Sequence, residues 1–278
     1  MSSAAVAANA DENQSGGKGQ AGKKEKSMTK FDLPNHSTRH GFMSEKIQFD
    51  YIATAIEKEL LPADAHRMSE IISLSAPRDA SKPIQFWQLY SVLGQDPIVG
   101  IVQRFYERVF ADEDWFTAVF ARVGGVDHHI NTQASMWIDV MGGGPYYHGA
   151  EFRLSFHHTH NAMQLMNEKG ATRWSQLMRD TLDASEDLMM HNPRVRRSIN
   201  TFLSYFMTKY ALEFAFDDHS AFGKTNPALR QKVNFMKMTE QAINALSEAE
   251  LGKALAERGV DISKYEGKES MVRKALMM

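Results

Sequence analysis

Apolar residues recur at intervals of three and four along most of the chain, a spacing that predicts helices burying one face. The first such stripe consists of Phe49, Ile52, Ile56 and Leu60. Pro62 ends it, because proline cannot continue a helix, and a second short helix is predicted over 63–74. Residues 79–83 resemble a linker. We therefore expect a helical extension over 46–83 that carries no chemistry of its own.

The strongest helical patterns fall within residues 84–218, the predicted main domain. One apolar stripe consists of Ile98, Ile101, Val102, Phe105 and Val109. A helix over 127–141 must end at the glycines and proline of 142–145. The longest stripe consists of Val195, Ile199, Phe202, Phe206, Tyr210 and Phe214. No segment of this domain alternates with the period of two that a strand requires, so the predicted fold class is all-α.

The two ends of the chain differ from the main domain. Residues 1–45 are rich in Ser, Ala, Gly, Gln and Lys, a composition that predicts a disordered tail. Over residues 219–278 the sequence predicts a connector and a small helical module. Two short helices of this module, joined by a turn, resemble a SAP-type helix–loop–helix. Acidic side chains balance the basic ones in this module, whereas phosphate binding requires a net basic face. We therefore expect a packing or partner module and no nucleic-acid binding.

Composition excludes several kinds of site. The chain has 278 residues, 43% of them hydrophobic, which is enough for a sizeable core. It contains no cysteine, so disulfides, iron–sulfur clusters, cysteine-bound zinc and thiol catalysis are excluded. The net charge of -2 indicates no particular partner. No apolar run approaches the roughly 20 residues that span a bilayer, and the N-terminus lacks the apolar core of a secretory signal. We expect a soluble, cytoplasmic protein.

The candidate chemistry lies in the histidines, of which six of eleven fall between residues 128 and 160. His157, His158 and His160 lie within one turn of chain, and His160 begins the spacing H-x-x-M-x-L. On a helix, Phe156, His160 and Met163 share one face, because neighbours on a helix surface are three and four residues apart. An imidazole among apolar residues suits a metal ligand. A structural histidine is the simpler alternative, and clustering alone does not separate haem from another metal.

A second set of polar residues falls on the helix predicted over 127–141. His129, Gln133 and Trp137 are four residues apart and share one face, while Ile130, Ala134 and Ile138 form the adjacent face. Tyr106, beside Phe105, is either an ordinary core aromatic or a residue that faces the same cavity.

The order of these features resembles that of the truncated haemoglobins over residues 86–216, nearest the second group of that family. The resemblance is carried by FYERV around Tyr106, by Phe120, by GGGP at 142–145, by the histidine segment and by Arg173-Trp174. It implies a shortened globin with a two-over-two arrangement of helices around haem b. It also implies that His160 is the proximal ligand of the iron.

The resemblance further assigns the haem pocket. Tyr106 matches the distal tyrosine that donates to bound ligand, Phe120 the aromatic against the haem plane, and Trp174 the tryptophan whose indole reaches the ligand. Three glycines stand where the family usually has two, which leaves two registers for the distal helix. We favour the one in which His129 and Gln133 face the ligand over the one with Ile130 and Ala134. The remaining predicted pocket residues are Trp137, Phe156 and Met163.

The function implied is that of a haem protein that binds dioxygen or another diatomic gas. Oxygen transport, storage, sensing and redox detoxification, including nitric oxide dioxygenation or peroxidase-like activity, use the same pocket, and the redox uses need a reductase as partner. Two alternatives stay open. One is a non-haem metalloprotein built on His128, His129, His157, His158 and His160, although H-E-x-x-H is absent. The other is a globin-like interaction protein that has lost haem.

Overall fold

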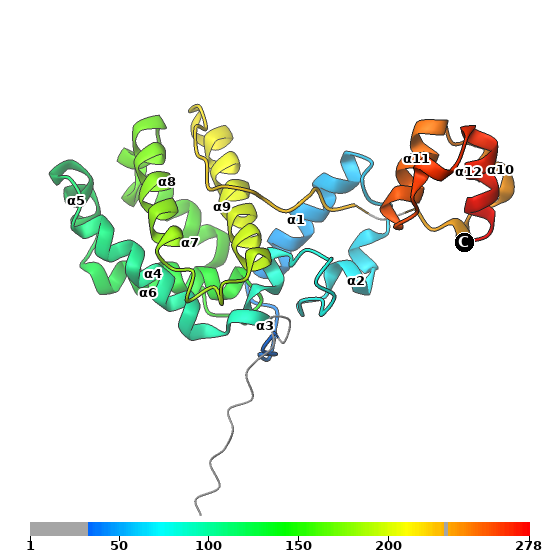
Figure 1. Ribbon diagram of the computed structural model, residues 1–278. Coiled ribbons are helices and arrows are strands. Elements are labelled where there is room, and N and C mark those ends of the chain that lie inside the picture. Colours follow the sequence, from blue (N-terminus) through cyan, green and yellow to red (C-terminus); the bar gives the residue numbers. More distant parts are fainter. Residues whose placement is uncertain (1–32, 231–232) are drawn as a thin grey trace, which may run out of the picture. The chain divides into compact units, whose positions relative to one another are not determined.

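Every regular element of the computed structural model is helical within residues 33–230 and 233–278, the part of the chain that the structure describes (Figure 1). The first range contains α1 (Ser44–Glu57), α2 (Ser69–Ile72), α3 (Leu89–Leu93), α4 (Gln95–Phe110), α5 (Asp114–Ala121), α6 (Val126–Val140), α7 (Ala150–Phe156), α8 (Glu168–Asp183) and α9 (Pro193–Phe214). The second contains α10 (Glu240–Ala245), α11 (Glu248–Glu257) and α12 (Gly267–Leu276). The predicted all-α class is confirmed.

Helix α4 lies at the centre of the main domain and packs against α5, α6 and α8. Its predicted apolar stripe is fully buried, and the aromatic side chains of Phe86, Trp87, Phe116 and Phe202 complete the core around it. Burying one such side chain contributes about 1.5–3 kcal/mol. The periodic pattern therefore identified both the helix and the face that it buries.

Two glycines shape the helices around the core. Gly94, with φ of 69°, separates α3 from α4, and Pro97 lies in the first turn of α4, where a missing N–H leaves no bond unmade. Gly170 lies inside the first turn of α8. A side chain there would collide with the Leu165 carbonyl, so this glycine permits a close approach of two segments.

The predicted disordered tail reached too far along the chain. Residues 1–32 lie outside the described residues, but 33–43 run along the main domain. The His36 N–H donates to the Ser91 carbonyl at 3.0 Å, the Arg39 N–H donates to Gly142 at 2.9 Å, and Met43 is buried. This order comes from pairing with distant backbone groups, which local composition does not reveal.

Buried Asp139, near the end of α6, ties this segment to the domain. Its two carboxylate oxygens accept the backbone N–H groups of Phe42, Met43 and Ser44, at 3.1, 2.8 and 3.2 Å. They also accept the N–H of Tyr147 at 3.1 Å. One side chain therefore fixes the start of α1, the end of α6 and the loop before α7.

Residues 233–278 have a core of their own. It consists of Phe235, Ile243, Leu251, Ala254, Leu255, Met271, Val272 and Ala275. Ser247 and Glu250 form a capping box at the start of α11. The Glu250 N–H donates to the Ser247 hydroxyl oxygen at 3.2 Å, and the Ser247 N–H donates to the Glu250 carboxylate at 2.7 Å. A single helical turn at Phe235–Lys237 precedes α10. The SAP-like resemblance stays a prediction.

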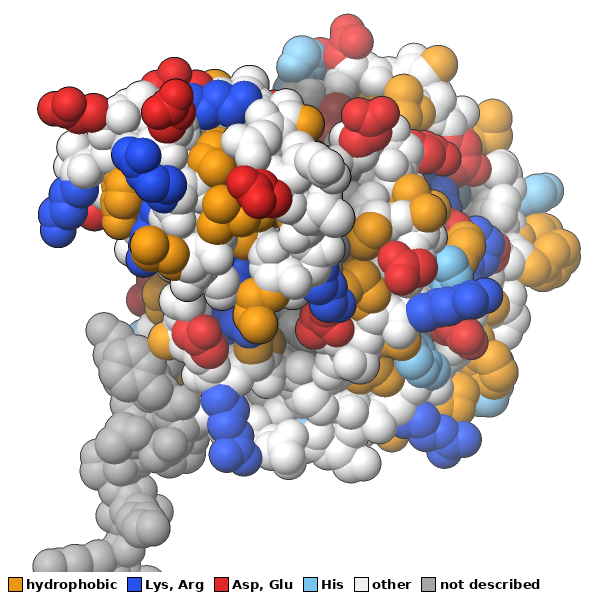
Figure 2. All heavy atoms as spheres, turned by 90° about the vertical axis from the view of Figure 1, so that its right-hand side faces the viewer, with side chains coloured by type: hydrophobic (Ala, Val, Ile, Leu, Met, Phe, Trp, Pro, Cys, Tyr) orange, Lys and Arg blue, Asp and Glu red, His pale blue; other side chains and the backbone are white. Residues whose placement is uncertain are grey.

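Acidic and basic side chains are interspersed on the face of the molecule drawn in Figure 2, so this face offers no basic patch for nucleic acid. Within 33–230 and 233–278, no helix combines the length and the apolar character needed to cross a bilayer.

The Asp139→Ala substitution is expected to lower the free energy of unfolding by about 3 kcal/mol or more, because it leaves several buried N–H donors unpaired. Urea unfolding followed by circular dichroism measures the change. Asp180→Ala is the matched control, because the Asp180 carboxylate is exposed and lies 3.9 Å from the guanidinium of its neighbour Arg179. Its expected effect is within about 0.5 kcal/mol. Equal losses in the two variants would contradict the role given to Asp139.

Candidate functional site

A cavity lies among α4, α6, α8, α9 and the segment that follows α7. Its water-accessible volume is about 170 Å³. Most of its wall is aromatic or aliphatic, with Phe120, Trp137, Leu165, Trp174, Phe202 and Phe206 among the lining side chains. A concave apolar site with a few polar groups is the usual form of a cofactor or ligand pocket.

Tyr106 on α4 and Gln133 on α6 form one polar pair in this wall. The Tyr106 hydroxyl donates to Oε1 of Gln133 at 2.7 Å. Burial raises the pKa of Tyr106 well above its ordinary value, so the phenol keeps its proton. The side-chain nitrogen of Gln133 is buried and has no hydrogen-bond partner within the described residues. An unpaired buried donor costs about 1–3 kcal/mol, so this amide is set to donate to a guest in the cavity.

His129 lies beside this pair. Its ring stacks on that of Tyr106, with centroids 5.2 Å apart, and its Nε2 lies 2.9 Å from the Phe120 carbonyl. A carbonyl only accepts, so Nε2 carries the proton. Burial lowers the pKa of His129, partly opposed by this bond, and the ring is neutral.

Helix α6 therefore presents His129, Gln133 and Trp137 to the cavity. Ile130 and Ala134 do not line it.

The histidine segment takes an unusual backbone course. Helix α7 continues into a π turn, His157–Asn161, in which the Ala162 N–H donates to the His157 carbonyl at 2.8 Å. His157 and His158 line the cavity, and the ring of His158 packs against Tyr210 at 4.3 Å between centroids. His160 is exposed, with its ring stacked on Phe156 at 4.2 Å.

Three of the predicted pocket residues lie outside this cavity. Phe156, His160 and Met163 do lie apart from Leu154, His157 and His158, as helical spacing required, but they form the outer face of the segment. Phe156 is 46% exposed and Met163 is 64% exposed, and none of the three lines the cavity. The H-x-x-M-x-L spacing groups residues on one side without revealing whether that side is buried. The π turn adds one residue to the turn and so changes which histidines point inward.

Burial keeps both cavity histidines neutral. It lowers the pKa of His157 to about 4, helped by the neighbouring rings of His129 and His128. It lowers the pKa of His158 to about 3, and His157 adds to this shift, because below its own pKa it is protonated and repels a second positive charge. A neutral imidazole is the form that binds a metal ion, so these rings are ready to serve as ligands at neutral pH.

Six of the predicted pocket residues line the cavity: Tyr106, Phe120, His129, Gln133, Trp137 and Trp174. Trp174 packs on Phe105 at 5.1 Å, and Trp137 packs on Phe202 at 5.3 Å. The prediction missed His158 and Tyr210. Tyr210 was already on the apolar stripe of the last long helix, and that position was the available signal for its facing inward.

The histidine cluster is not arranged as a non-haem metal site. In the described part of the chain, the one group of three or more ligand atoms within 4.8 Å of one another consists of Glu168, Asp217 and His219. None of the five histidines of that alternative belongs to it.

Comparison with known proteins adds an independent finding. A family profile described as bacterial-like globin matches residues 88–209, the region that encloses most of the cavity. Residues 88–209 are thus similar to the bacterial-like globins, and the relatives that follow are truncated haemoglobins. The chain is 29% identical over 101 residues to two-on-two hemoglobin-3 of Arabidopsis thaliana. It is 30% identical over 101 residues to group 2 truncated hemoglobin 3-1 of Lotus japonicus.

These matches cover 36% of this chain, and 57% and 59% of the two relatives. The chain therefore spans less than two thirds of the length of the curated globins that it matches. No solved structure matches the chain.

We expect the globin domain, freed of any cofactor, to lose stability as the pH falls from 6.5 to 5. In this window an unfolded histidine, with a pKa near 6.5, binds a proton that folded His158, with a pKa of about 3, does not bind. The loss is about 2 kcal/mol for each such ring. Urea unfolding at several pH values measures it.

The double variant His157→Gln, His158→Gln should flatten this dependence on pH. His191→Gln serves as the control, because His191 is exposed beside Glu186. A double variant with the pH dependence of the parent protein would show that the two rings are not held neutral.

Proposed function

We propose that this globin domain holds haem b and binds dioxygen or another diatomic gas beside it. The observation that carries the proposal is the buried Tyr106–Gln133 pair, whose amide nitrogen has no partner, in the same cavity as neutral His158. The cavity thus combines a metal ligand with a donor that requires an acceptor. The relatives are named hemoglobins, and their similarity to this domain supports the proposal.

The residues of the cavity suit haem. Its walls are largely aromatic and aliphatic, as a flat apolar macrocycle requires, and Phe120, Trp137 and Trp174 contribute much of that surface. Axial histidine is a common ligand of haem iron, and it binds as neutral imidazole. When bound, the iron would supply the position at which the gas binds.

We assign the iron ligand to His158. It lines the cavity and is held neutral, whereas His160, which the family resemblance implied, is exposed on the outer face. His157 also lines the cavity, but only the His158 ring packs on an aromatic side chain of α9. Tyr210 packs against the His158 ring and would fix its orientation.

The ultraviolet–visible spectrum of the purified protein, ferric and ferrous, tests both points. The parent protein is expected to show a Soret band, His158→Ala to lose or shift it, and His160→Ala to retain it. His191→Ala controls for the loss of an exposed histidine. A Soret band that depends on His160 would overturn the assignment to His158. A parent protein with no Soret band after haem is added would overturn the haem proposal itself.

On the distal side, the Gln133 amide nitrogen is the group that would donate to the gas, and the Tyr106 hydroxyl, which donates to Oε1 of Gln133, would hold that amide in position. Each neutral hydrogen bond contributes on the order of 1 kcal/mol, or roughly fivefold in a dissociation rate. The family resemblance adds the Trp174 indole as a second donor. Two donors slow release of the gas, which suits retention or redox chemistry more than rapid oxygen transport.

Gln133→Leu should raise the dissociation rate of dioxygen by roughly fivefold, because it removes the donor and keeps the bulk of the side chain. Tyr106→Phe should raise the rate less, because it removes only the hydrogen bond that positions Gln133. Stopped-flow absorption of the ferrous protein measures the rate. Tyr51→Phe is the control, since Tyr51 packs on Phe86 and Trp87 and does not line the cavity. An unchanged rate in Gln133→Leu would show that this amide does not contact the gas.

Storage, sensing, nitric oxide dioxygenation and peroxidase-like activity all rest on the same cavity, and the redox uses need a reductase. We place the function among gas retention, sensing and redox detoxification. The cytoplasmic location stays a prediction.

A further inference from the structure

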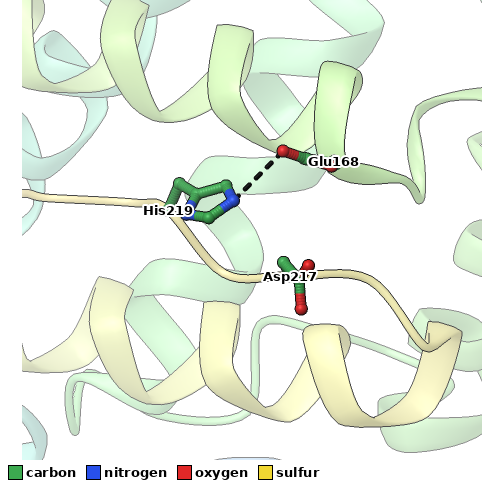
Figure 3. A group of neighbouring side chains, drawn as sticks. All are labelled: Glu168, Asp217 and His219. Atoms are coloured by element: carbon green, nitrogen blue, oxygen red, sulfur yellow. Dashed lines mark ion pairs between the residues drawn. The ribbon is translucent and has the colours of Figure 1, made fainter.

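A second group of potential metal ligands lies outside the cavity. Glu168 is the first residue of α8, and Asp217 and His219 lie on the segment that follows α9 (Figure 3). Nε2 of His219 lies 3.1 Å from a carboxylate oxygen of Glu168. One ligand atom from each of the three side chains lies within 4.8 Å of the other two. Two carboxylates and an imidazole thus converge from two separate elements.

The charges of this group are not balanced by the protein. At neutral pH the two carboxylates carry two negative charges at close range, which repel each other. In the ranges 33–230 and 233–278, no lysine or arginine nitrogen lies within 4.0 Å of either carboxylate. His219 is the one potential cation among their ion-pair partners there. A bound divalent cation would neutralise both carboxylates and accept the imidazole as a third ligand.

The backbone on both sides is held in place. The Asn167 side chain caps α8 by accepting the Gly170 N–H at 3.0 Å, which positions Glu168. The Phe216 N–H donates to the Ala211 carbonyl at 3.1 Å, and the Ser220 N–H donates to the Asp218 carboxylate at 2.9 Å. Residues on either side of Asp217 and His219 are therefore fixed by hydrogen bonds. Only short side-chain movements separate the present arrangement from one that chelates a metal ion.

We propose that Glu168, Asp217 and His219 bind a divalent transition-metal ion such as Zn²⁺, with water in the remaining positions. Imidazole nitrogen favours zinc and related ions over Mg²⁺ and Ca²⁺, which prefer oxygen ligands alone. Three protein ligands with an open position are a common arrangement for zinc that remains accessible to solvent. All three side chains are exposed, so a hydrated ion reaches them without any opening of the fold.

The site would clamp part of the cavity wall. Gly170 and Ala171, which follow Glu168, and Phe216, which precedes Asp217, all line the cavity. An ion held between Glu168 and Asp217 would bind α8 to the segment after α9 at that wall. The metal would thereby restrict movement of the segment 215–222 without entering the cavity.

Isothermal titration with Zn²⁺ alone tests the site on the full chain after removal of metals with a chelator. The parent protein is expected to bind one more equivalent of zinc than Asp217→Asn or His219→Gln, or to bind that equivalent at least tenfold more tightly. The difference between variants is the readout, because the chain has eleven histidines and other rings can bind zinc weakly.

His191→Gln is the matched control. His191 belongs to another exposed His–Glu pair, with Nδ1 3.6 Å from Glu186, but it has no second carboxylate in its group. This variant should bind zinc like the parent protein. Equal stoichiometry and affinity in all four proteins would overturn the proposal.

Amide hydrogen exchange gives a second readout that is independent of stoichiometry. Zinc should slow exchange in residues 216–222 of the parent protein and not in Asp217→Asn. Zinc binding that leaves this segment unchanged would place the ion elsewhere and so overturn the site. Neither measurement uses haem, so its outcome is separate from that of the proposed gas binding.

Discussion

The arrangement of the globin domain depends on the hydrogen bonds that the buried carboxylate of Asp139 accepts. The carboxylate accepts backbone N–H groups from residues about a hundred positions earlier and from the loop that leads into α7. A buried charge is costly unless hydrogen bonds compensate it, and here they come almost entirely from the main chain. The same carboxylate therefore determines how α1 is attached and where the chain turns toward the histidine segment. The position of the cavity wall follows from that turn.

The two sides of the cavity carry different chemical groups. On one side the Tyr106 hydroxyl donates to Oε1 of Gln133, and the side-chain nitrogen of Gln133 has no hydrogen-bond partner among the described residues. His129 donates from Nε2 to the Phe120 carbonyl. On the other side, burial keeps His157 and His158 neutral. One wall thus offers a hydrogen-bond donor and the other a lone pair on nitrogen. A guest with a Lewis-acidic centre and an attached acceptor is complementary to both.

Sequence patterns were sufficient for the features that depend on local periodicity. The stripes of α4 and α9 predicted both the helices and their buried faces, and the four-residue spacing of His129, Gln133 and Trp137 predicted residues that share a wall. They failed where the outcome depends on distant contacts. The sequence around Asp139 does not indicate that its carboxylate accepts the backbone N–H groups of residues 42–44. Likewise, no local pattern predicts that residues 33–43 pair with the main domain. Which histidines of the segment line the cavity depends on a π turn, which a pattern based on 3.6 residues per turn does not contain.

That π turn also bears on how the domain tolerates change in its length. Successive residues of a helix are separated by about 100° of rotation, so the loss or gain of one residue turns every later side chain to a new direction. In most functional segments such a change would turn the binding side chain away from the site. Here three of four consecutive positions, His157 to His160, are histidines, and the wider turn accommodates an added residue. Insertions and deletions at this point therefore still present an imidazole to the interior, and the segment is robust to the kind of mutation that usually destroys a site.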